Sequence, residues 1–319
     1  AVKARVVTPF EHAQESDTRR MIAVIADDLT GAGDTAVQFA KQGLGTIVLL
    51  GSPLPAGGSE ETVVVRDSRS RALTPEEAYG RVAGIAAHFR DGGFGTLFKK
   101  IDSTLRGNIG REIDAVMDTC GQEVAVVAPA FPKNGRVTVA GYLLLHGIPV
   151  EATEIAQDPL CPVTESHIPT LLAAQTVRKV GHVGIKSVTA GPEAIRLAMQ
   201  RLIAAGTEVI LCDAWRDEHL RMAAGEALRL GRRVLWVGSA GLAEHLPAAL
   251  GVTASPAKSL AARTPAADRP VVVLAGSLST VTRDQVGMLR NRPAIASVEA
   301  DPGKLLRPET ADREIGRCG

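Results

Sequence analysis

Short runs rich in valine and isoleucine alternate along most of the chain with alanine-rich segments of helical period. The runs predict strands at 21–26, 46–50, 62–66, 96–99, 123–128, 180–184, 208–212, 233–237 and 270–275. The segments between them predict helices near 32–42, 74–90, 108–119, 191–205, 216–230, 239–249 and 279–290. Strands that alternate with helices need crossover connections, which make neighbouring strands parallel. The sequence therefore predicts an α/β fold, a mostly parallel sheet flanked by helices.

The composition agrees with this fold. Aromatic residues are only 3% of the chain, so the core has to be built from Ala, Val, Leu and Ile, which suits helices packed on parallel strands. Residues 137–148 depart from the alternation and predict a hairpin or an extended excursion rather than another βα unit.

The chain of 319 residues is long enough for two domains. Residues 1–20 have no apolar signal-peptide core and are expected to be an extension with little structure. Residues 21–250 carry the alternating pattern, and 251–269, rich in Ala, Pro and Ser, are expected to be a linker. Residues 270–319 hold one βα unit and a polar tail, and such a unit cannot bury its own faces. They therefore predict part of a second α/β domain.

Several classes of partner are disfavoured by charge and composition. The net charge is +1, with 36 basic and 35 acidic residues in no long run, which gives no argument for nucleic acid or an anionic membrane. Four cysteines stand far apart and predict reduced thiols, and no metal-ligand spacing is present. No stretch approaches the roughly 18 apolar residues of a membrane span. The expected location is the cytoplasm, and a homo-oligomer is compatible with these properties.

Charged and hydroxyl-bearing residues follow four of the first five predicted strands. They form the runs Asp27-Asp28-Leu29-Thr30-Gly31, Asp67-Ser68-Arg69-Ser70-Arg71, Lys99-Lys100-Ile101-Asp102-Ser103-Thr104-Leu105-Arg106 and Pro129-Ala130-Phe131-Pro132-Lys133. Each run alone reads equally well as a solvated loop or a helix cap. Because the carboxyl ends of parallel strands meet at one edge of a sheet, the four runs together predict a polar ligand site there.

The residue types narrow the ligand. Arg69, Arg106 and either Lys99 or Lys100 are suited to hold a carboxylate or a phosphate. Asp27, Asp28 and Asp102 are suited to polyol hydroxyls, to a magnesium ion or to removal of a proton from an attacking hydroxyl. The combination predicts a small, hydroxylated, anionic ligand.

Other readings of the same runs stay open. Gly31-x-Gly33-x-x-Ala36 fits a dinucleotide fingerprint and hence an oxidoreductase, although the next strand ends without an acid for the ribose. Carboxylates and a lysine at successive strand ends also fit a phosphoacceptor receiver-like signalling module, although the α/β pattern continues well beyond the length of one. Thr30 to Asp34 is similar to the catalytic turn of ribokinase-type kinases, which lies late in their chains. A Walker A loop is absent.

Two later turns are rich in glycine and serine and precede predicted helices. Gly238-Ser239-Ala240-Gly241-Leu242 and Gly276-Ser277-Leu278-Ser279-Thr280 each bring backbone N–H groups to a helix start, where an anion can bind. Each equally fits a tight strand–helix turn.

Several of these motifs resemble the four-carbon acid sugar kinase family. The resemblance rests on Ile25-Ala26-Asp27-Asp28-Leu29-Thr30-Gly31-Ala32, on Lys100 to Gly107, on Pro129 to Pro132 and on the two glycine–serine turns, and it covers residues 21 to about 290 in the family's order. It implies a sugar-acid-binding domain followed by a nucleotide-binding domain.

The resemblance also implies an activity and a set of site residues. The activity is ATP- and Mg²⁺-dependent phosphorylation of the terminal hydroxyl of D-threonate, D-erythronate or a 3-oxo-tetronate. The implied sugar-acid ligands are Asp27, Asp28, Asp67, Arg69, Lys100, Asp102, Ser103 and Arg106, with one of Asp27, Asp28 and Asp102 orienting or deprotonating the hydroxyl. Ser277, with Ser279 as the alternative, is implied to contact ATP, and Gly238 and Ser239 are candidates for the same role.

Family members continue with a glycine-rich nucleotide-binding segment, whereas this chain ends at Arg317-Cys318-Gly319 after a charged tail. The second domain is therefore expected to be incomplete, with impaired catalysis and intact sugar-acid binding.

Overall fold

The computed structural model describes residues 21–50, 63–252, 271–276 and 280–318. By its internal contacts the chain divides into two compact units, residues 1–258 and 259–319. The predicted extension 1–20 and most of the predicted linker 251–269 lie outside the described residues.

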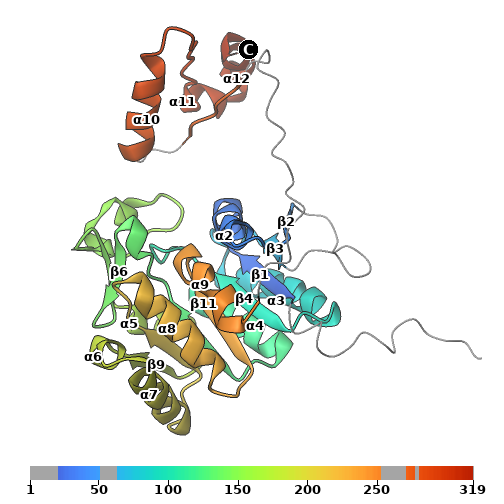
Figure 1. The fold of residues 1–319 in the computed structure, drawn as a ribbon. Helices are drawn as coiled ribbons and strands as arrows, with labels where there is room; N and C mark the ends of the chain where they lie inside the picture. The colour runs from blue at the N-terminus through green and yellow to red at the C-terminus, as the bar shows by residue number, and fades with distance from the viewer. Residues whose placement is uncertain (1–20, 51–62, 253–270, 277–279, 319) are drawn as a thin grey trace, which may run out of the picture. The chain divides into compact units, whose positions relative to one another are not determined.

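The first unit is built on an eight-stranded sheet with spatial order β2-β3-β1-β4-β11-β5-β10-β9, in which every pairing is parallel (Figure 1). Its strands are β1 (Ile22–Ala26), β2 (Thr46–Leu49), β3 (Val63–Asp67), β4 (Thr96–Lys100), β5 (Val124–Ala128), β9 (Val180–Val183), β10 (Val209–Cys212) and β11 (Val234–Gly238). All eight were predicted, and the predicted parallel α/β fold is confirmed.

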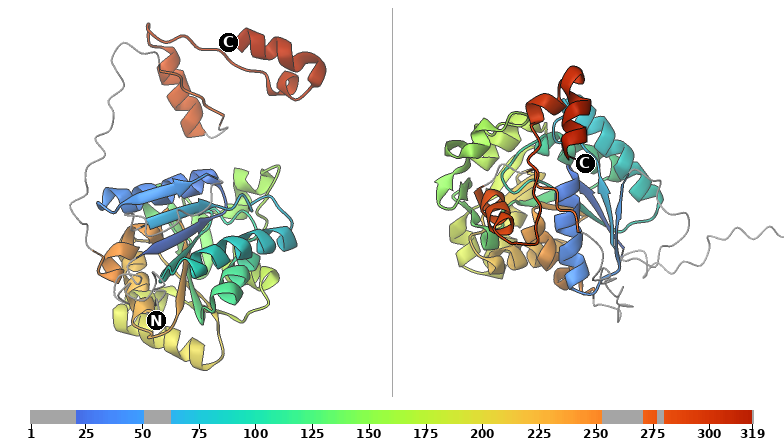
Figure 2. Two further views of the ribbon diagram at one scale, coloured as in Figure 1. Left: turned by 90° about the vertical axis from the view of Figure 1, so that its right-hand side faces the viewer. Right: turned by 90° about the horizontal axis from the view of Figure 1, so that it is seen from above.

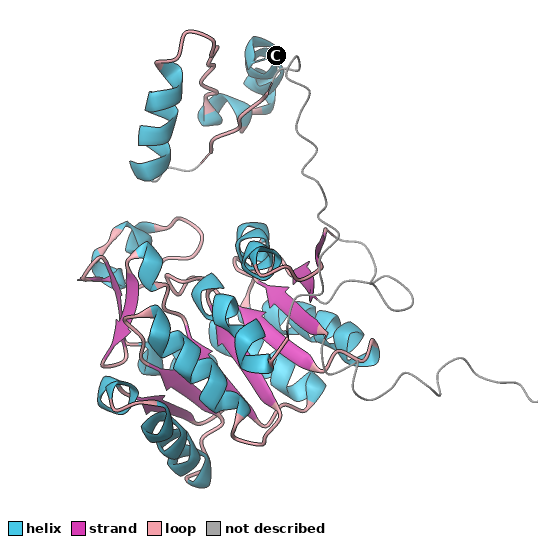
Figure 3. Cartoon of the chain, in the orientation of Figure 1, coloured by secondary structure: helices cyan, strands magenta, loops and turns pink. Residues whose placement is uncertain are grey.

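Helices cover both faces of this sheet (Figures 2 and 3). One face packs against α2 (Leu29–Lys41), α6 (Ile185–Thr189), α7 (Pro192–Ala204), α8 (Asp217–Leu228) and α9 (Ala240–Leu250). The other face packs against α3 (Pro75–Asp91), α4 (Ile109–Cys120) and α5 (Ile168–Gln175). Strand residues alternate between the two cores, as in β1, where Ile22 and Val24 face one and Ala23 and Ile25 the other. Both cores consist mainly of Ala, Val, Leu and Ile, as predicted.

A small antiparallel sheet forms the predicted hairpin. It consists of β6 (Arg136–Val139), β7 (Tyr142–Leu145) and β8 (Ile148–Pro149), with the short 3-10 helices Pro132–Asn134, Val150–Ala152 and Glu154–Gln157 beside it in the chain. The β6–β7 turn has positive φ at Ala140 and Gly141, the geometry of a two-residue type I′ turn. The buried Asp213, just beyond β10, accepts hydrogen bonds from both turn amides at 2.8 and 3.0 Å and so ties the hairpin to the main sheet.

The second unit contains α10 (Thr280–Arg290), α11 (Pro302–Leu305) and α12 (Pro308–Cys318) in its described residues. The predicted helix 279–290 is present, but the predicted strand 270–275 is not, because residues 271–276 have no regular secondary structure. A strand needs a neighbour for its backbone hydrogen bonds, and the described part of this unit holds none. Val271, Val272 and Leu274 are each at least 75% exposed as a result.

The short helices α5, α6, α11 and α12 were not predicted. Among the described residues, no helix has both the length and the apolar character that crossing a bilayer requires.

Candidate functional site

The carboxyl ends of five adjacent strands form one row across the first unit. In the register of the sheet, Ala26 of β1 lies between Asp67 of β3 and Lys100 of β4, and Gly238 of β11 lies between Lys100 and Ala128 of β5. The loops that leave this row are the polar runs identified in the sequence. The predicted convergence of these runs on one edge of the sheet is therefore observed.

Arg71 lies at the centre of this edge, and its side chain is only 16% exposed. Its Nε donates a 2.7 Å hydrogen bond to Asp27 Oδ2, and its Nη1 lies 2.7 Å from Asp28 Oδ2. Its Nη2 lies 4.0 Å from Asp102 Oδ1. One guanidinium thus lies within 4.0 Å of three carboxylates delivered by the ends of β1 and β4.

The backbone of the β3–α3 loop brings Arg71 to this position. Asp27 O accepts hydrogen bonds from Ser70 N at 3.1 Å and Arg71 N at 3.3 Å, and Ala26 O accepts from Ser68 N at 2.8 Å. Arg69 has a φ of 50°, the left-handed region that a non-glycine residue adopts at some cost. This local reversal turns the Arg69 side chain outward.

The predicted ligand Arg69 therefore makes no ion pair with Asp27, Asp28 or Asp102 among the described contacts. Its side chain is 72% exposed and pairs at 3.6 Å with Asp67, whose Oδ1 also accepts from Arg69 N at 2.8 Å. Arg71 was missed as a site residue although it stands in the same run, because sequence spacing does not show which arginine of the run is turned inward.

Asp27 has one free oxygen. Its side chain is 3% exposed, Oδ2 is bound by Arg71, and Oδ1 has no hydrogen-bond partner among the described residues. A buried carboxylate oxygen without a partner is costly, and a ligand that supplied a hydroxyl donor would satisfy it.

Asp28 has a structural task as well. It is the N-cap of α2, and its Oδ1 accepts a 2.8 Å hydrogen bond from Gly31 N. A methyl group at Gly31 would lie 2.7 Å from Asp28 Oδ1 and 2.9 Å from Lys100 Nζ, so the lysine ammonium lies against the first turn of α2. The Asp28 carboxylate occupies the place that a pyrophosphate would take in a dinucleotide fold, which argues against the fingerprint reading.

Lys100 and Lys99 have separate surroundings because adjacent strand residues face opposite sides of a sheet. Lys100 Nζ donates to Ile101 O at 2.9 Å, its single hydrogen bond to the described residues, whereas an ammonium has three donors. Burial lowers the pKa of Lys100, and the charges of Asp27, Asp102 and Asp28 oppose that effect. Lys99 is fully buried in an ion pair with Glu112 at 2.8 Å and is not part of this edge.

Asp102 shapes the loop that follows β4. Its Oδ2 accepts from Thr104 Oγ1, from Arg106 N at 3.4 Å and from Arg106 Nε at 2.7 Å, and Oδ1 accepts from Arg106 Nη2 at 3.3 Å. Burial alone would raise the pKa of Asp102, but the hydrogen bonds and charge of Arg106 and the charge of Arg71 hold it well below its ordinary value. The buried Leu105 in this turn has a φ of 67°.

The other predicted ligands lie close by in the chain. Ser103 is half-buried within the same turn. Arg106 also pairs with Asp158 Oδ2 at 3.0 Å, and Asp158 Oδ1 accepts from Leu160 N and Cys161 N. Asp158 is a second residue that was missed, and it carries no signal in the sequence because it stands about fifty positions from its partner.

The first glycine–serine turn is explained by packing. A methyl group at Gly238 would lie 2.6 Å from Ala128 O, and the buried Ser239 hydroxyl donates to Ala130 O at 2.7 Å while capping α9 through Gly241 N. Its hydroxyl is therefore used within the fold. The predicted ATP contacts Ser277 and Ser279 lie outside the described residues.

Magnesium does not fit the carboxylates of this edge as they stand. The oxygens of Asp28 and Asp102 face guanidinium, amide or hydroxyl donors, which leaves Asp27 Oδ1 as the one free oxygen of Asp27, Asp28 and Asp102. The described residues hold no group of three side chains arranged to bind a metal ion.

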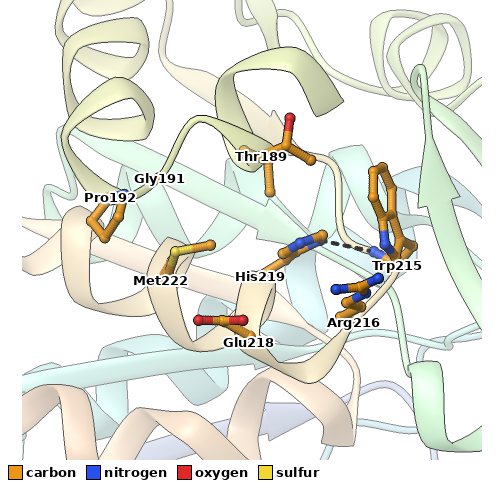
Figure 4. A pocket seen from close by; sticks show the side chains of 9 residues that line it. Thr189, Gly191, Pro192, Trp215, Arg216, Glu218, His219 and Met222 are labelled. Atoms are coloured by element: carbon orange, nitrogen blue, oxygen red, sulfur yellow. Dashed lines mark hydrogen bonds between the residues drawn. The ribbon is translucent and has the colours of Figure 1, made fainter.

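A cavity of about 460 Å³ lies elsewhere, beyond the ends of β9 and β10 (Figure 4). Trp215, His219 and Met222 of the β10–α8 region form one side of it, and Thr189 to Pro192 form the other. It contains none of the predicted site residues. We place the candidate site at the charged edge because the unpaired donors and acceptor gather there.

Comparison with known proteins identifies the first unit. The family model of a sugar-binding N-terminal domain matches residues 22–246. A D-erythronate kinase of Heliobacterium modesticaldum is 36% identical over 93% of this chain, and a D-threonate kinase of Salmonella typhimurium is 34% identical over 92%. The chain spans 66% of the length of each of these two relatives.

A solved structure agrees with these matches. A domain of unknown function from Bordetella bronchiseptica, crystallised with bound citrate as a domain-swapped dimer, is 39% identical with a TM-score of 0.62, over 72% of this chain and 55% of that chain. The family model, the curated relatives and the fold converge on one assignment: the chain belongs to the four-carbon acid sugar kinase family.

Proposed function

We propose that the first unit binds a four-carbon sugar acid at the edge formed by β3, β1 and β4, and that the protein phosphorylates the terminal hydroxyl of this acid with ATP. D-threonate, D-erythronate and a 3-oxo-tetronate are the candidate substrates. They share a carboxylate at one end of a short hydroxylated chain.

One observation carries the proposal: several hydrogen-bond donors and one acceptor in a single charged cluster have no partner among the described residues. Lys100 has two N–H donors without a partner among the described residues, since it makes one bond, to Ile101 O. Arg71 Nη2 lies 4.0 Å from Asp102 Oδ1, too far for a hydrogen bond. Asp27 Oδ1 is a buried acceptor. Cationic donors suit a carboxylate, and a carboxylate oxygen suits a hydroxyl.

The same contacts distribute roles among the carboxylates. Asp28 caps α2, and both oxygens of Asp102 are held by the 104–106 loop. Of Asp27, Asp28 and Asp102, Asp27 is the one with a free oxygen, and we assign to it the orientation and deprotonation of the attacking hydroxyl. Lys100 and Arg71 anchor the substrate carboxylate, while Asp102 and Arg106 hold the loop beside it.

The nucleotide contributes the phosphoryl group when it is bound, with magnesium as its counter-ion. We assign no step of the reaction to residues of the second unit, because Ser277 and Ser279 are not described. The contribution of the first unit is to bind and orient the acid and to hold the hydroxyl proton at Asp27.

The comparisons support this proposal in two ways. The names of the relatives are those of kinases for four-carbon sugar acids. The Bordetella structure contains citrate, which is itself a hydroxylated carboxylate, and its domain-swapped dimer supports a homo-oligomeric assembly for this chain too.

The activity is tested by ADP formation that depends on a sugar acid. The protein is incubated with ATP, Mg²⁺ and each of D-threonate, D-erythronate, L-threonate and 3-oxo-tetronate, and phosphoester formation is followed by phosphorus NMR. The Salmonella relative serves as the positive control. A phosphoester from one of these acids is expected, formed more slowly than by the control because the second domain of this chain was predicted to be incomplete. No phosphoester from any of them, with the control active, would contradict the assignment of kinase activity to this chain.

A further inference from the structure

Glu112 of α4 is a buried carboxylate that the proposed chemistry does not use. Its side chain is 1% exposed, its Oε2 lies 2.8 Å from Lys99 Nζ, and its Oε1 accepts a hydrogen bond from Ser70 Oγ. A buried ion pair is not by itself stabilising, because removing two charges from water costs about as much as their attraction returns. The position of this pair beneath the sugar-acid site therefore calls for another explanation.

Glu112 makes two sets of contacts, which we call its arms. The first arm starts at Oε1 and reaches the ends of β3 and β1. The hydroxyl of Ser70, which Glu112 binds, lies 2.7 Å from that of Ser68, and Ser68 Oγ donates to Ala26 O at 2.7 Å. The backbone amide of Ser70, with that of Arg71, donates to Asp27 O. The arm thus holds the loop that carries Arg71 against the strand end that carries Asp27.

The other arm starts at Glu112 Oε2 and reaches the end of β4 through Lys99. Lys99 Nζ, besides pairing with Glu112, donates a 2.7 Å hydrogen bond to Lys100 O. Lys100 is the last residue of β4, and its ammonium lies on the opposite side of the strand, within the site. A single carboxylate on α4 is therefore connected to all three strand ends that deliver Asp27, Arg71 and Lys100.

We propose that Glu112 is the positioning residue of the sugar-acid site, which sets the mutual placement of Arg71, Asp27 and Lys100 from beneath the sheet edge. This inference rests on the proposed sugar-acid function. Precise placement of binding groups requires partners that lock them, and in some proteins a buried ionic network contributes to specificity rather than to stability.

A pair of substitutions separates positioning from a merely structural role. Glu112→Gln leaves Lys99 as an uncompensated buried cation and is expected to lower Tm. The double variant Lys99→Met with Glu112→Leu replaces the pair by apolar side chains of similar size, and its Tm is expected to recover. Its dissociation constant for the sugar acid is nevertheless expected to be about tenfold larger than that of the wild type, because the three strand ends are no longer linked.

Glu226 offers a matched control. It is also a buried carboxylate, 2% exposed, on α8, and it pairs with Arg229 and, at 3.8 Å, with Arg196. Glu226→Gln is expected to lower Tm without changing the affinity for the sugar acid, because it contacts none of the three strand ends.

Amide hydrogen exchange gives a second readout that needs no ligand. The amides of Ser68, Ser70 and Arg71 are expected to exchange faster in the double variant than in the wild type. Ser70→Ala, which keeps the ion pair and cuts one arm, replaces the double variant if the latter does not fold, and it is expected to change affinity and exchange in the same directions.

The outcomes are distinguishable. Wild-type affinity together with wild-type exchange in a folded variant would overturn the inference. A wild-type protein that binds no four-carbon sugar acid would overturn the proposed function instead, and the exchange rates alone would then decide whether Glu112 positions the loop.

Discussion

At the scale of single residues, the site is organised around the pairing of Arg71 with three carboxylates. Asp27 and Asp28 follow one another at the end of β1, and their like charges repel. A cation that pairs with both carboxylates offsets this repulsion. Arg71 provides that cation in a planar fork that lysine cannot reproduce. Arg69, two positions earlier, is exposed and offers a natural comparison.

Arg71→Ala is expected to weaken sugar-acid binding by about 10- to 100-fold, since a hydrogen bond to a charged group contributes about 1.5–3 kcal/mol. It is also expected to lower the free energy of unfolding by on the order of 3 kcal/mol, because a largely buried group of carboxylates loses its counter-charge. Calorimetry and urea unfolding measure the two effects. Arg69→Ala should leave both unchanged, and an equal loss of affinity in the two variants would show that Arg71 has no special place in the site.

We expect sugar-acid binding to depend on pH because of the buried ammonium of Lys100. Burial holds its pKa below the ordinary 10.5 of a lysine. Its ammonium form is the one that attracts an anion, so the affinity should be complete well below the folded pKa and should fall as the pH rises through it, before 10.5 is reached. Titrations between pH 7 and 10.5 measure this fall. In Lys100→Met the affinity should be weak and flat across the same range; a wild-type affinity that stays constant to pH 10.5 would contradict the assignment.

At the scale of elements, the start of α2 joins helix formation to the site. Asp28 caps the helix through Gly31 N, and the absence of a side chain at Gly31 lets the Lys100 ammonium approach the first turn. Gly33, two residues further along the same helix, is exposed, and no atom lies within 4 Å of the position that a methyl group there would take.

Gly31→Ala is therefore expected to weaken sugar-acid binding. The new methyl group would lie only 2.9 Å from the present position of Lys100 Nζ and 2.7 Å from that of Asp28 Oδ1, so both side chains would have to move. Gly33→Ala should raise the free energy of unfolding by roughly 0.5–1 kcal/mol and leave binding unchanged. Calorimetry and thermal unfolding of the two variants provide the comparison. Equal affinities in both would mean that the close approach of Lys100 to α2 does not matter for binding.

The elements also show what sequence could and could not predict. The eight parallel strands and the polar edge followed from hydrophobic period and from the rule that strand ends converge. The inward turn of Arg71 depends on the positive φ of Arg69, and the Arg106–Asp158 pair depends on tertiary packing, so neither has a local signature. The predicted strand 270–275 has the right residues, but a strand also requires a partner.

At the scale of the whole molecule, the first unit contains every described residue of the candidate site and both hydrophobic cores. In the second unit, Val271, Leu274 and Leu306 are largely exposed, and the described residues there include no strand. Sugar-acid binding is accordingly expected to be a property of the first unit.

A fragment of residues 21–252 should therefore bind the sugar acid as tightly as the whole chain. Its Tm should differ from that of the first transition of the whole chain by less than about 2 °C, since 1 kcal/mol shifts Tm by roughly 2–4 °C in a domain of this size. Calorimetric titration and scanning measure both quantities. A folded fragment with clearly lower affinity would show that residues beyond 252 contribute to the site.

The most direct test of the account is a calorimetric titration of this chain with D-threonate and D-erythronate, with threitol and erythritol as controls that lack the carboxylate. We expect at least one acid to bind and the alcohols to bind about tenfold more weakly or not at all, because Arg71 and Lys100 present their free donors to the carboxylate. Binding of neither acid, by a chain shown to be folded, would contradict the central claim.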